Sequence, residues 1–290
     1  MSSAPLDLFR PSSTLDSDSL SKKITLLGTI NSVKAILQLE KSHFNFSNEI
    51  PITTVHQIAH NDVYYWGTTL LEQDLDTNPA AKFNLIYPAS EAHIAKYQKH
   101  PVHMVVETPE AYEKVVKPYI ETQKGDRLQW VRNILYHGVE KERVVFKNDD
   151  YILLPDMKWD GTTIESLYLV CIVFRDDISS IRDLTEDDIP YLKRIKESIL
   201  VEVPKKYGIA RDQLRLYVHY QPSFYHFHIH VVNASYGGLG QTQAAGKAIL
   251  LGEVIETLRL LGKKGYKGKS IEYGLSEGHD LWSGMKEYAN

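Results

Sequence analysis

The sequence predicts an α+β fold with a small β-rich N-terminal domain and a larger C-terminal domain, in which helices flank an antiparallel sheet. The chain has 290 residues, 43% hydrophobic and 24% charged, which is ordinary globular composition and fits two modest domains. Residues 22–106 consist mainly of short apolar runs of strand length. The rest of the chain mixes such runs with segments of helical periodicity.

Composition excludes several classes of protein. No apolar stretch approaches the ~20 residues of a membrane-spanning helix. The single cysteine, Cys171, excludes a disulfide framework and a cysteine-based zinc site, and it is typical of a reducing compartment. The net charge of −4 gives no sign of binding to DNA or RNA duplexes without sequence preference, because such proteins are basic.

The N-terminal part begins with a serine-rich segment, residues 1–20, that has almost no apolar pattern and is predicted to be a flexible tail. A domain at 21–104 follows. Ser90 is expected to cap a short helix that ends near Gln98. Strands are predicted at 23–30, 35–40, 63–69, 83–87 and 102–107.

The C-terminal domain, 105–290, combines helices and strands. Thr185 and Asp188 form a capping-box pattern at the start of one helix. Other helices are predicted at 109–123, at 126–136 with Asp126 as cap, and at 243–261, ending at Gly262. Strands are predicted at 143–147, 151–154, 167–174, 214–220 and 225–233.

The clearest functional signal is an alternation of histidines. Residues 226–232 read His-Phe-His-Ile-His-Val-Val. Because successive side chains of a strand point to opposite faces, His226, His228 and His230 are expected to share one face while the apolar residues face the core. Adjacent imidazoles repel one another when charged, so the row indicates a site rather than a structural feature.

Two chemistries could use such a row. Three histidines can hold zinc with an open fourth position, although three alternate residues of one flat strand converge poorly on a single ion. Alternatively, a neutral imidazole attacks phosphorus while its neighbours bind phosphate oxygens and protonate the leaving group. The pattern by itself leaves both open.

The heptapeptide matches the histidine triad motif, His-φ-His-φ-His-φ-φ, at every position. Surrounding segments make the chain similar to the scavenger mRNA decapping enzymes of that superfamily, fungal type. These segments are Tyr-Pro-Ala at 87–89, Leu-Gln-Trp-Val at 128–131, Leu-Pro-Asp-Met-Lys-Trp at 154–159, Arg-Asp-Leu-Thr at 182–185, His-Tyr-Gln-Pro-Ser-Phe-Tyr at 219–225 and Glu-Val-Ile-Glu at 253–256. The resemblance runs from about residue 61 to about residue 282, and the first sixty residues match mainly in their β-rich character.

The resemblance implies a pyrophosphatase that hydrolyses the 7-methylguanosine cap of cap dinucleotide and short capped oligonucleotides after mRNA decay, releasing 7-methylguanosine monophosphate. His228 would be the nucleophile and would form a phosphohistidine, while His226 and His230 would orient it and bind phosphate oxygens. The resemblance further implies no cofactor or metal, no membrane or DNA partner, a homodimer with exchanged N-terminal domains, and a cytoplasmic location with the nucleus as an alternative.

A methylated guanine is cationic, so an aromatic face and carboxylates are its expected ligands. By resemblance, Trp130 stacks on the base, although its spacing alone fits a helix core residue equally well. Met157 would lie on the opposite side of the base. The remaining implied base contacts are Glu140, Asp156, Asn61 and Asp62.

The resemblance also implies a set of phosphate contacts: Lys158, His219, Ser223, Lys247, Tyr64 and Lys96. Lys247 is expected near the start of the last helix, where the helix dipole would support anion binding. The family commonly has arginine there. Phe224 stands where some family members carry tyrosine, so a hydroxyl contact to phosphate is expected to be missing, with an effect on turnover rather than on binding.

Two further hypotheses stay open at this point. The chain could be a catalytically weak cap-binding regulatory subunit that pairs with an active paralogue in a heterodimer. It could instead be another histidine triad hydrolase, acting on dinucleoside polyphosphates or phosphoramidates. A zinc enzyme is the least favoured hypothesis.

Overall fold

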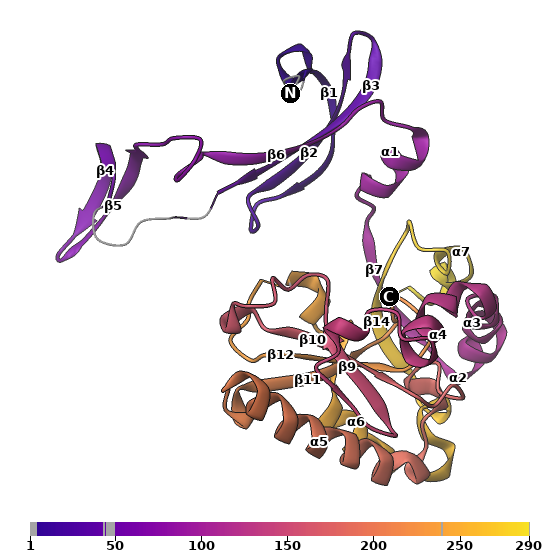
Figure 1. Cartoon of the computed structure of the whole chain (residues 1–290). Coiled ribbons are helices and arrows are strands. Elements are labelled where there is room, and N and C mark those ends of the chain that lie inside the picture. The colour runs from indigo at the N-terminus through magenta and orange to yellow at the C-terminus, as the bar shows by residue number, and fades with distance from the viewer. Residues whose placement is uncertain (1–4, 43, 45–49, 239, 290) are drawn as a thin grey trace. The chain divides into compact units, whose positions relative to one another are not determined.

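The computed structural model describes residues 5–42, 44, 50–238 and 240–289. The chain folds into two compact units, with the boundary between His100 and Pro101 in the sequence, close to the predicted boundary at 104/105. The first unit is rich in strands, and the second combines antiparallel sheets with helices (Figure 1). The predicted α+β class is therefore confirmed.

The first unit contains an antiparallel four-stranded sheet in the order β1-β2-β3-β6. Its strands are β1 (Arg10–Asp18), β2 (Lys23–Ile30), β3 (Val33–Lys41) and β6 (Ala81–Ile86). A small core forms from Phe9, Ile30, Ala35 and Leu37. Helix α1 (Glu91–Tyr97) begins after Ser90, whose side chain accepts a hydrogen bond from the backbone N–H of His93 at 3.3 Å, which confirms the predicted cap.

The prediction of a tail at 1–20 was wrong for its described part. Residues Pro5–Leu8 form a 3-10 turn and Arg10–Asp18 form β1, which pairs with β2. Leu15 is the one buried residue of β1. A serine-rich segment with one buried residue shows no alternation of apolar and polar residues, so sequence analysis does not detect the strand. This strand is held mainly by its backbone hydrogen bonds. Residues 1–4 of the predicted tail lie outside the described residues.

A β-hairpin, β4 (Ile52–Asn61) and β5 (Tyr64–Leu71), forms a separate two-stranded sheet in this unit. The sequence predicted only its second strand. Asp62, in the two-residue turn, has a φ of 51°, a left-handed conformation that aspartate tolerates. Nearly every residue of the hairpin is exposed, including its aromatic side chains.

The second unit is built on a six-stranded antiparallel sheet in the order β13-β11-β12-β10-β9-β8. Strands β7 and β14 pair separately. The bounds are β7 (Val102–Glu107), β8 (Phe146–Lys147), β9 (Tyr151–Pro155), β10 (Tyr168–Val173), β11 (Leu214–His219), β12 (His228–Asn233), β13 (Ala248–Leu250) and β14 (Ile271–Ser276).

Helices cover both faces of this sheet (Figure 1). They are α2 (Pro109–Ala111), which continues through a π turn (Tyr112–Val116) into α3 (Lys117–Thr122), then α4 (Gln129–Tyr136), α5 (Ile189–Tyr207), α6 (Leu251–Leu261) and α7 (Trp282–Met285). The capping box at Thr185 and Asp188 precedes α5 as predicted. In the described part of the chain, no helix is long and apolar enough to cross a bilayer.

The two faces of the sheet have separate cores. Apolar residues of α5 and α6 pack with Ile229 and Val231 of β12 in the main core. Residues of α4 pack with Ile152 of β9 and Ile172 of β10 in a smaller core. His228 pairs with Ile172 across the ladder, and cross-strand partners point to the same side. The α4 side of the sheet is therefore the face that carries the histidines.

Several predicted elements differ from the structure. The helix predicted at 243–261 is α6, which begins at Leu251, because β13 pairs with β11 and precedes it. The strand predicted at 143–147 is only Phe146–Lys147, since Lys141–Arg143 form a 3-10 turn. Lys247 is thus not at a helix N-terminus, and the expected support from a helix dipole is wrong. Strand β12 begins at His228, so His226 precedes the strand instead of lying in it. Asp126 lies within a 3-10 turn (Gly125–Leu128), and α4 starts only at Gln129.

A buried polar network ties the second unit together. Glu107, at the end of β7, and Arg182 form an ion pair at 2.6 Å, and both side chains are 0% exposed. Arg182 also donates to the carbonyl oxygens of Tyr266 and Lys269. The Glu107 carboxylate further accepts from the Tyr220 hydroxyl at 2.5 Å and from Nε2 of Gln221 at 2.9 Å. The loop before β12 is thereby anchored to β7.

Candidate active site

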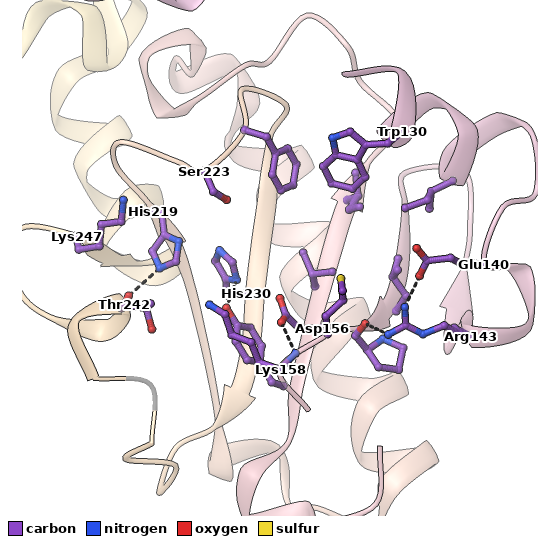
Figure 2. A pocket seen from close by; sticks show the side chains of 18 residues that line it. Trp130, Glu140, Arg143, Asp156, Lys158, His219, Ser223, His230, Thr242 and Lys247 are labelled. Carbon is purple, nitrogen blue, oxygen red and sulfur yellow. Dashed lines mark hydrogen bonds and ion pairs between the residues drawn. The ribbon is translucent and has the colours of Figure 1, made fainter. Parts of the chain in front are cut away.

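A cavity of about 450 Å³ opens in the second unit, and the predicted site residues of that unit other than His226 and His228 line it (Figure 2). Figure 2 shows Trp130 and Glu140 at one end and His219 and Lys247 at the other. The predicted residues that line the cavity are Trp130, Glu140, Asp156, Met157, Lys158, His219, Ser223, His230 and Lys247. Strands β11 and β12, helix α4 and the loops that follow α4 and β9 or flank β11 and β13 supply them, so one sheet brings together segments far apart in sequence.

Four predicted site residues belong to the first unit. Asn61, Asp62 and Tyr64 lie at the turn of the β4–β5 hairpin, and Lys96 lies on α1. All four are exposed. None of them lines the cavity of the second unit, and their roles remain predictions.

The end of the cavity near α4 has the features of a base-binding site. Trp130 is 44% exposed and Met157 is 90% exposed, so both offer apolar surface. Arg143 donates to Oε2 of Glu140 at 2.5 Å and to the carbonyl oxygen of Pro155 at 3.0 Å, which fixes the direction of the Glu140 carboxylate. Sequence reasoning missed Arg143; its spacing of three residues from Glu140 was the one available signal.

The loop after β9 is ordered by its own aspartate. Oδ1 of Asp156 accepts from the backbone N–H of Lys158 at 2.9 Å, a side-chain turn that holds Met157 and Lys158 at the cavity. Nζ of Lys158 lies 5.8 Å from the ring centroid of Tyr168. Tyr168 is a second lining residue that the sequence did not indicate, and its hydroxyl lies 2.9 Å from Nδ1 of His230.

Hydrogen bonds fix the tautomer of the central histidine. Nδ1 of His228 lies 2.8 Å from the carbonyl oxygen of His226. A carbonyl only accepts, so Nδ1 carries the hydrogen, and Nε2 of the neutral ring holds a lone pair. Nε2 of His228 is buried without a hydrogen-bond partner. His226 in turn donates from Nε2 to the carbonyl oxygen of Val173 at 2.8 Å.

Burial keeps this group of histidines neutral. Loss of hydration lowers the pKa of His228 to about 4, against the opposing effect of its hydrogen bond to the His226 backbone. Burial likewise lowers the pKa of His219 to about 4 and the pKa of His230 well below its ordinary value. At neutral pH, His228 therefore presents an unprotonated Nε2, the form that attacks an electrophile.

The other end of the cavity carries cations. Lys247 donates from Nζ to the carbonyl oxygen of Gln221 at 2.5 Å, and burial lowers its pKa. His219 donates from Nε2 to the carbonyl oxygen of Thr242 at 2.7 Å, so its neutral ring offers no second N–H to a phosphate. Lys158, Lys247 and the exposed hydroxyl of Ser223 remain as donors for anionic oxygens.

Phe224 joins the two ends of the site. Its ring stacks on the imidazole of His228, with centroids 4.0 Å apart and an interplanar angle of 14°. The same ring meets Trp130 edge to face at 4.8 Å and 77°. Among the described residues, no group of three or more histidine, cysteine, aspartate or glutamate side chains could hold a metal ion.

The depressed histidine pKa values predict a loss of stability in mild acid. In the unfolded chain these histidines titrate near their ordinary pKa of about 6.5, so unfolding takes up protons between pH 6.5 and 4. The contribution of each neutral histidine to the free energy of unfolding is complete above pH 6.5. It falls by about 1.4 kcal/mol per pH unit as the pH drops through this window. Urea unfolding at pH 7, 6 and 5 measures it.

Two variants serve as controls for that measurement. His219→Gln should flatten the pH dependence, because one titrating group is removed. His137→Asn, at an exposed position after α4, should leave it unchanged. A free energy of unfolding that is constant from pH 7 to pH 5 in the unaltered protein would contradict the prediction.

Comparison with known proteins adds independent findings. The family model described as scavenger mRNA decapping enzyme N-terminal matches residues 4–100, and the model described as scavenger mRNA decapping enzyme C-term binding matches residues 129–246. The m7GpppX diphosphatase of Schizosaccharomyces pombe is 41% identical over 285 residues, covering 94% of this chain and 93% of the relative. The proteins of the same name from Ascaris suum and Homo sapiens are 39% and 30% identical, covering 85% and 98% of this chain and 83% and 86% of their own lengths.

Proposed function

The chain belongs to the scavenger mRNA decapping enzyme family, and on this premise we propose that it is an m7GpppX diphosphatase. It hydrolyses the 7-methylguanosine cap of cap dinucleotide and of short capped oligonucleotides left by mRNA decay, and releases 7-methylguanosine monophosphate. One observation carries the proposal: a single cavity joins an exposed tryptophan and a carboxylate at one end to the buried, neutral His219 and His230, which stands beside His228 on β12.

The base end suits a methylated guanine. The positive charge of the methylated ring favours stacking on Trp130, with Met157 covering the opposite side. The Glu140 carboxylate, oriented by Arg143, accepts hydrogen bonds from the guanine N–H edge, and we assign the same role to Asp156, which also lines the cavity. These groups select the cationic base because they supply electron-rich acceptors rather than donors.

The chemical step uses the lone pair of His228. Nε2 attacks the phosphorus attached to the methylated guanosine; the N–P bond forms while the bond to the bridging oxygen breaks, and the nucleoside diphosphate departs with that electron pair. The ring becomes cationic, and its Nδ1–H bond to the His226 carbonyl stabilises that charge. Water then adds to phosphorus, the N–P electron pair returns to Nε2, and a proton is released.

Several groups support the transferred phosphoryl. We assign Lys158, Lys247 and Ser223, which all line the cavity, as the donors for its oxygens. The hydroxyl of Tyr168 holds His230 against the site at 2.9 Å. We assign His226 and His230 to orienting and binding, as the resemblance implies. We also propose that the reaction takes place in the cytoplasm, with the nucleus as the alternative. The one cysteine of the chain, Cys171, is free and buried, which is typical of a reducing compartment.

The test is product analysis with the methylated cap dinucleotide and its unmethylated counterpart. The unaltered protein should release 7-methylguanosine monophosphate and a nucleoside diphosphate, and it should prefer the methylated substrate. Trp130→Ala should weaken binding of the methylated cap by about 5- to 160-fold, since stacking of one base on an aromatic side chain contributes about 1–3 kcal/mol. Trp130→Phe, which keeps a stacking face, should recover most of the affinity. Equal use of both substrates, with no effect of Trp130→Ala, would instead indicate another histidine triad hydrolase.

We further propose that the protein is a homodimer in which the N-terminal units are exchanged. The β4–β5 hairpin supports this, because an isolated two-stranded hairpin is marginal in water and this one exposes many apolar residues. They are Val55, Ile58, Val63, Tyr64, Tyr65, Trp66 and Leu70. In such a dimer, Asn61, Asp62, Tyr64 and Lys96 of one subunit would close over the cap bound by the other.

Light scattering tests the dimer. The mass expected is about twice the 33.2 kDa of one chain. The double variant Tyr65→Ser, Trp66→Ser should shift the protein toward monomer, because it removes aromatic surface from the hairpin. Leu260→Ser is the matched control, since Leu260 is also exposed but lies on α6. A monomeric unaltered protein at micromolar concentration would refute the proposal.

A further inference from the structure

His230 carries a buried polar atom that no protein group satisfies. His230 is 5% exposed and lines the cavity, and its Nε2 is buried without a hydrogen-bond partner. Buried polar atoms of folded proteins are nearly always hydrogen-bonded, so an orphaned one at a cavity points to a ligand. Whether Nε2 carries a hydrogen decides the kind of ligand, because only an N–H can bind an anionic oxygen.

The two central histidines differ in what their Nδ1 atoms meet. Nδ1 of His228 lies 2.8 Å from the carbonyl oxygen of His226, which only accepts, so that ring keeps its lone pair on Nε2. Nδ1 of His230 lies instead 2.9 Å from the hydroxyl of Tyr168, and a hydroxyl can both donate and accept. His230 can therefore hold the opposite tautomer, with its hydrogen on Nε2.

The hydroxyl of Tyr168 is a buried group with few choices. Among the described residues, His230 is its one partner at hydrogen-bond geometry, and Tyr168 is only 1% exposed. Burial raises the pKa of Tyr168 and the nearby Tyr217 adds to this, yet the Tyr217 hydroxyl makes no hydrogen bond of good geometry. If Tyr168 accepted from Nδ1, its own hydrogen would be buried without an acceptor, and a lone pair on Nε2 would repel an anion. If Tyr168 donates to Nδ1, both groups are satisfied once an anionic oxygen reaches Nε2.

His230 lies where an anion is expected. Burial is the largest cause that lowers its pKa well below the ordinary value, and the charges of Lys158 and Lys247 add to the effects of burial and of the neighbouring histidines. These are the two lysines that we assign to the phosphoryl oxygens. The His230 ring is neutral at pH 7, so it has one N–H to offer. Tyr217 fixes the plane of the ring by stacking on it, with centroids 5.1 Å apart and an interplanar angle of 21°.

We propose that Tyr168 is a positioning residue: its hydroxyl donates to Nδ1 of His230, keeps the hydrogen of that ring on Nε2, and so makes His230 a donor to the phosphoryl group that His228 attacks. The proposal rests on the proposed function and deepens it. Two histidines that alternate on β12 thus take opposite tautomers, one with a lone pair for phosphorus and one with an N–H for its oxygens. A donor fixed in advance in a dry site stabilises the charge that develops on these oxygens.

The tautomer of His230 can be read in the unaltered protein. Long-range proton–nitrogen correlation spectra of protein with isotope-labelled histidine distinguish an Nδ1–H from an Nε2–H ring, and His230→Ala identifies the signals by their loss. The product 7-methylguanosine monophosphate places a phosphate group in the site without turnover. With it bound, His230 should carry its hydrogen on Nε2. A hydrogen on Nδ1, in a neutral or a cationic ring, would overturn the proposal.

Tyr168→Phe removes the hydroxyl and keeps the ring. It should lower kcat for cap dinucleotide about 10- to 100-fold and leave KM within about twofold, because the base end is untouched and the donor is misdirected rather than lost. Tyr151→Phe is the matched control. Tyr151 is also a buried tyrosine of this sheet, but its hydroxyl lies 2.9 Å from Oγ of Ser198 and outside the cavity. The control should keep the kcat of the unaltered protein at a similar cost in urea stability.

A double-variant cycle shows whether Tyr168 acts through His230. In a His230→Ala protein, the added change Tyr168→Phe should cause no further loss of kcat, because the ring that Tyr168 positions is absent. The same loss in both backgrounds would refute the proposal, and so would an unchanged kcat in Tyr168→Phe alone. Failure of the proposed function looks different, because it would appear as absence of cap hydrolysis by the unaltered protein. A protein that hydrolyses caps with the hydrogen of His230 on Nδ1 loses only the role of Tyr168.

Discussion

His228→Asn is expected to abolish release of 7-methylguanosine monophosphate from cap dinucleotide, with a loss in kcat of about 10,000-fold or more. Asparagine fits the buried space, and its amide can still donate to the carbonyl oxygen of His226, which His228 bonds at 2.8 Å. It has no nitrogen lone pair to attack phosphorus. Cap binding should persist, because Trp130, Met157 and Glu140 are untouched.

The measurement combines a product assay with calorimetric titration of the methylated cap. His137→Asn makes the same chemical change at an exposed position outside the cavity, and it should keep the rate of the unaltered protein. Undiminished hydrolysis by His228→Asn would remove His228 from the mechanism. Loss of cap binding together with hydrolysis would mean that the variant had disturbed the site as a whole.

Glu107→Gln should produce the largest loss of stability, about 3–5 kcal/mol in the free energy of unfolding of the second unit. The carboxylate pairs with Arg182 at 2.6 Å, and neither side chain has any exposure. A neutral amide leaves the guanidinium charged in a dry interior, where it is not compensated. Urea unfolding followed by tryptophan fluorescence measures the effect, since Trp130, Trp159 and Trp282 all lie in this unit.

Glu277→Gln is the matched control, because Glu277 pairs with His103 at 2.9 Å on the surface, where both side chains are 39% exposed. Its loss should be below about 1 kcal/mol. The double variant Glu107→Leu, Arg182→Met should recover part of the stability lost in Glu107→Gln, because it removes the stranded charge together with its partner. A Glu107→Gln protein as stable as the control would show that the buried pair contributes nothing.

Much of the fold could be predicted from local patterns in the sequence. Ser90 and the Thr185 box marked helix starts because capping depends on neighbours in sequence. The alternation at His228 and His230 marked a strand face for the same reason. β13 was misassigned because its three residues are extended through pairing with β11, a contact that no local periodicity reports. The helical pattern from 251 onward concealed it.

The site was predictable to the extent that residue types reveal chemistry. Trp130 and Glu140 were reached through the resemblance and do line one cavity. Arg143 and Tyr168 were missed because each acts by touching a residue distant in sequence, Pro155 in one case and His230 in the other. The double contact of Phe224 was likewise invisible, since it depends on how the loop brings one ring between His228 and Trp130.

The network around Glu107 also bears on folding kinetics. Its partners lie 75, 113 and 114 residues along the chain, at Arg182, Tyr220 and Gln221. Such distant segments meet only after large loops have closed, so we expect these contacts to form after the folding transition state. Loss of the carboxylate should then raise the unfolding rate and leave the refolding rate nearly unchanged. The ion pair thus governs how long the folded second unit survives, while its speed of formation depends on more local contacts.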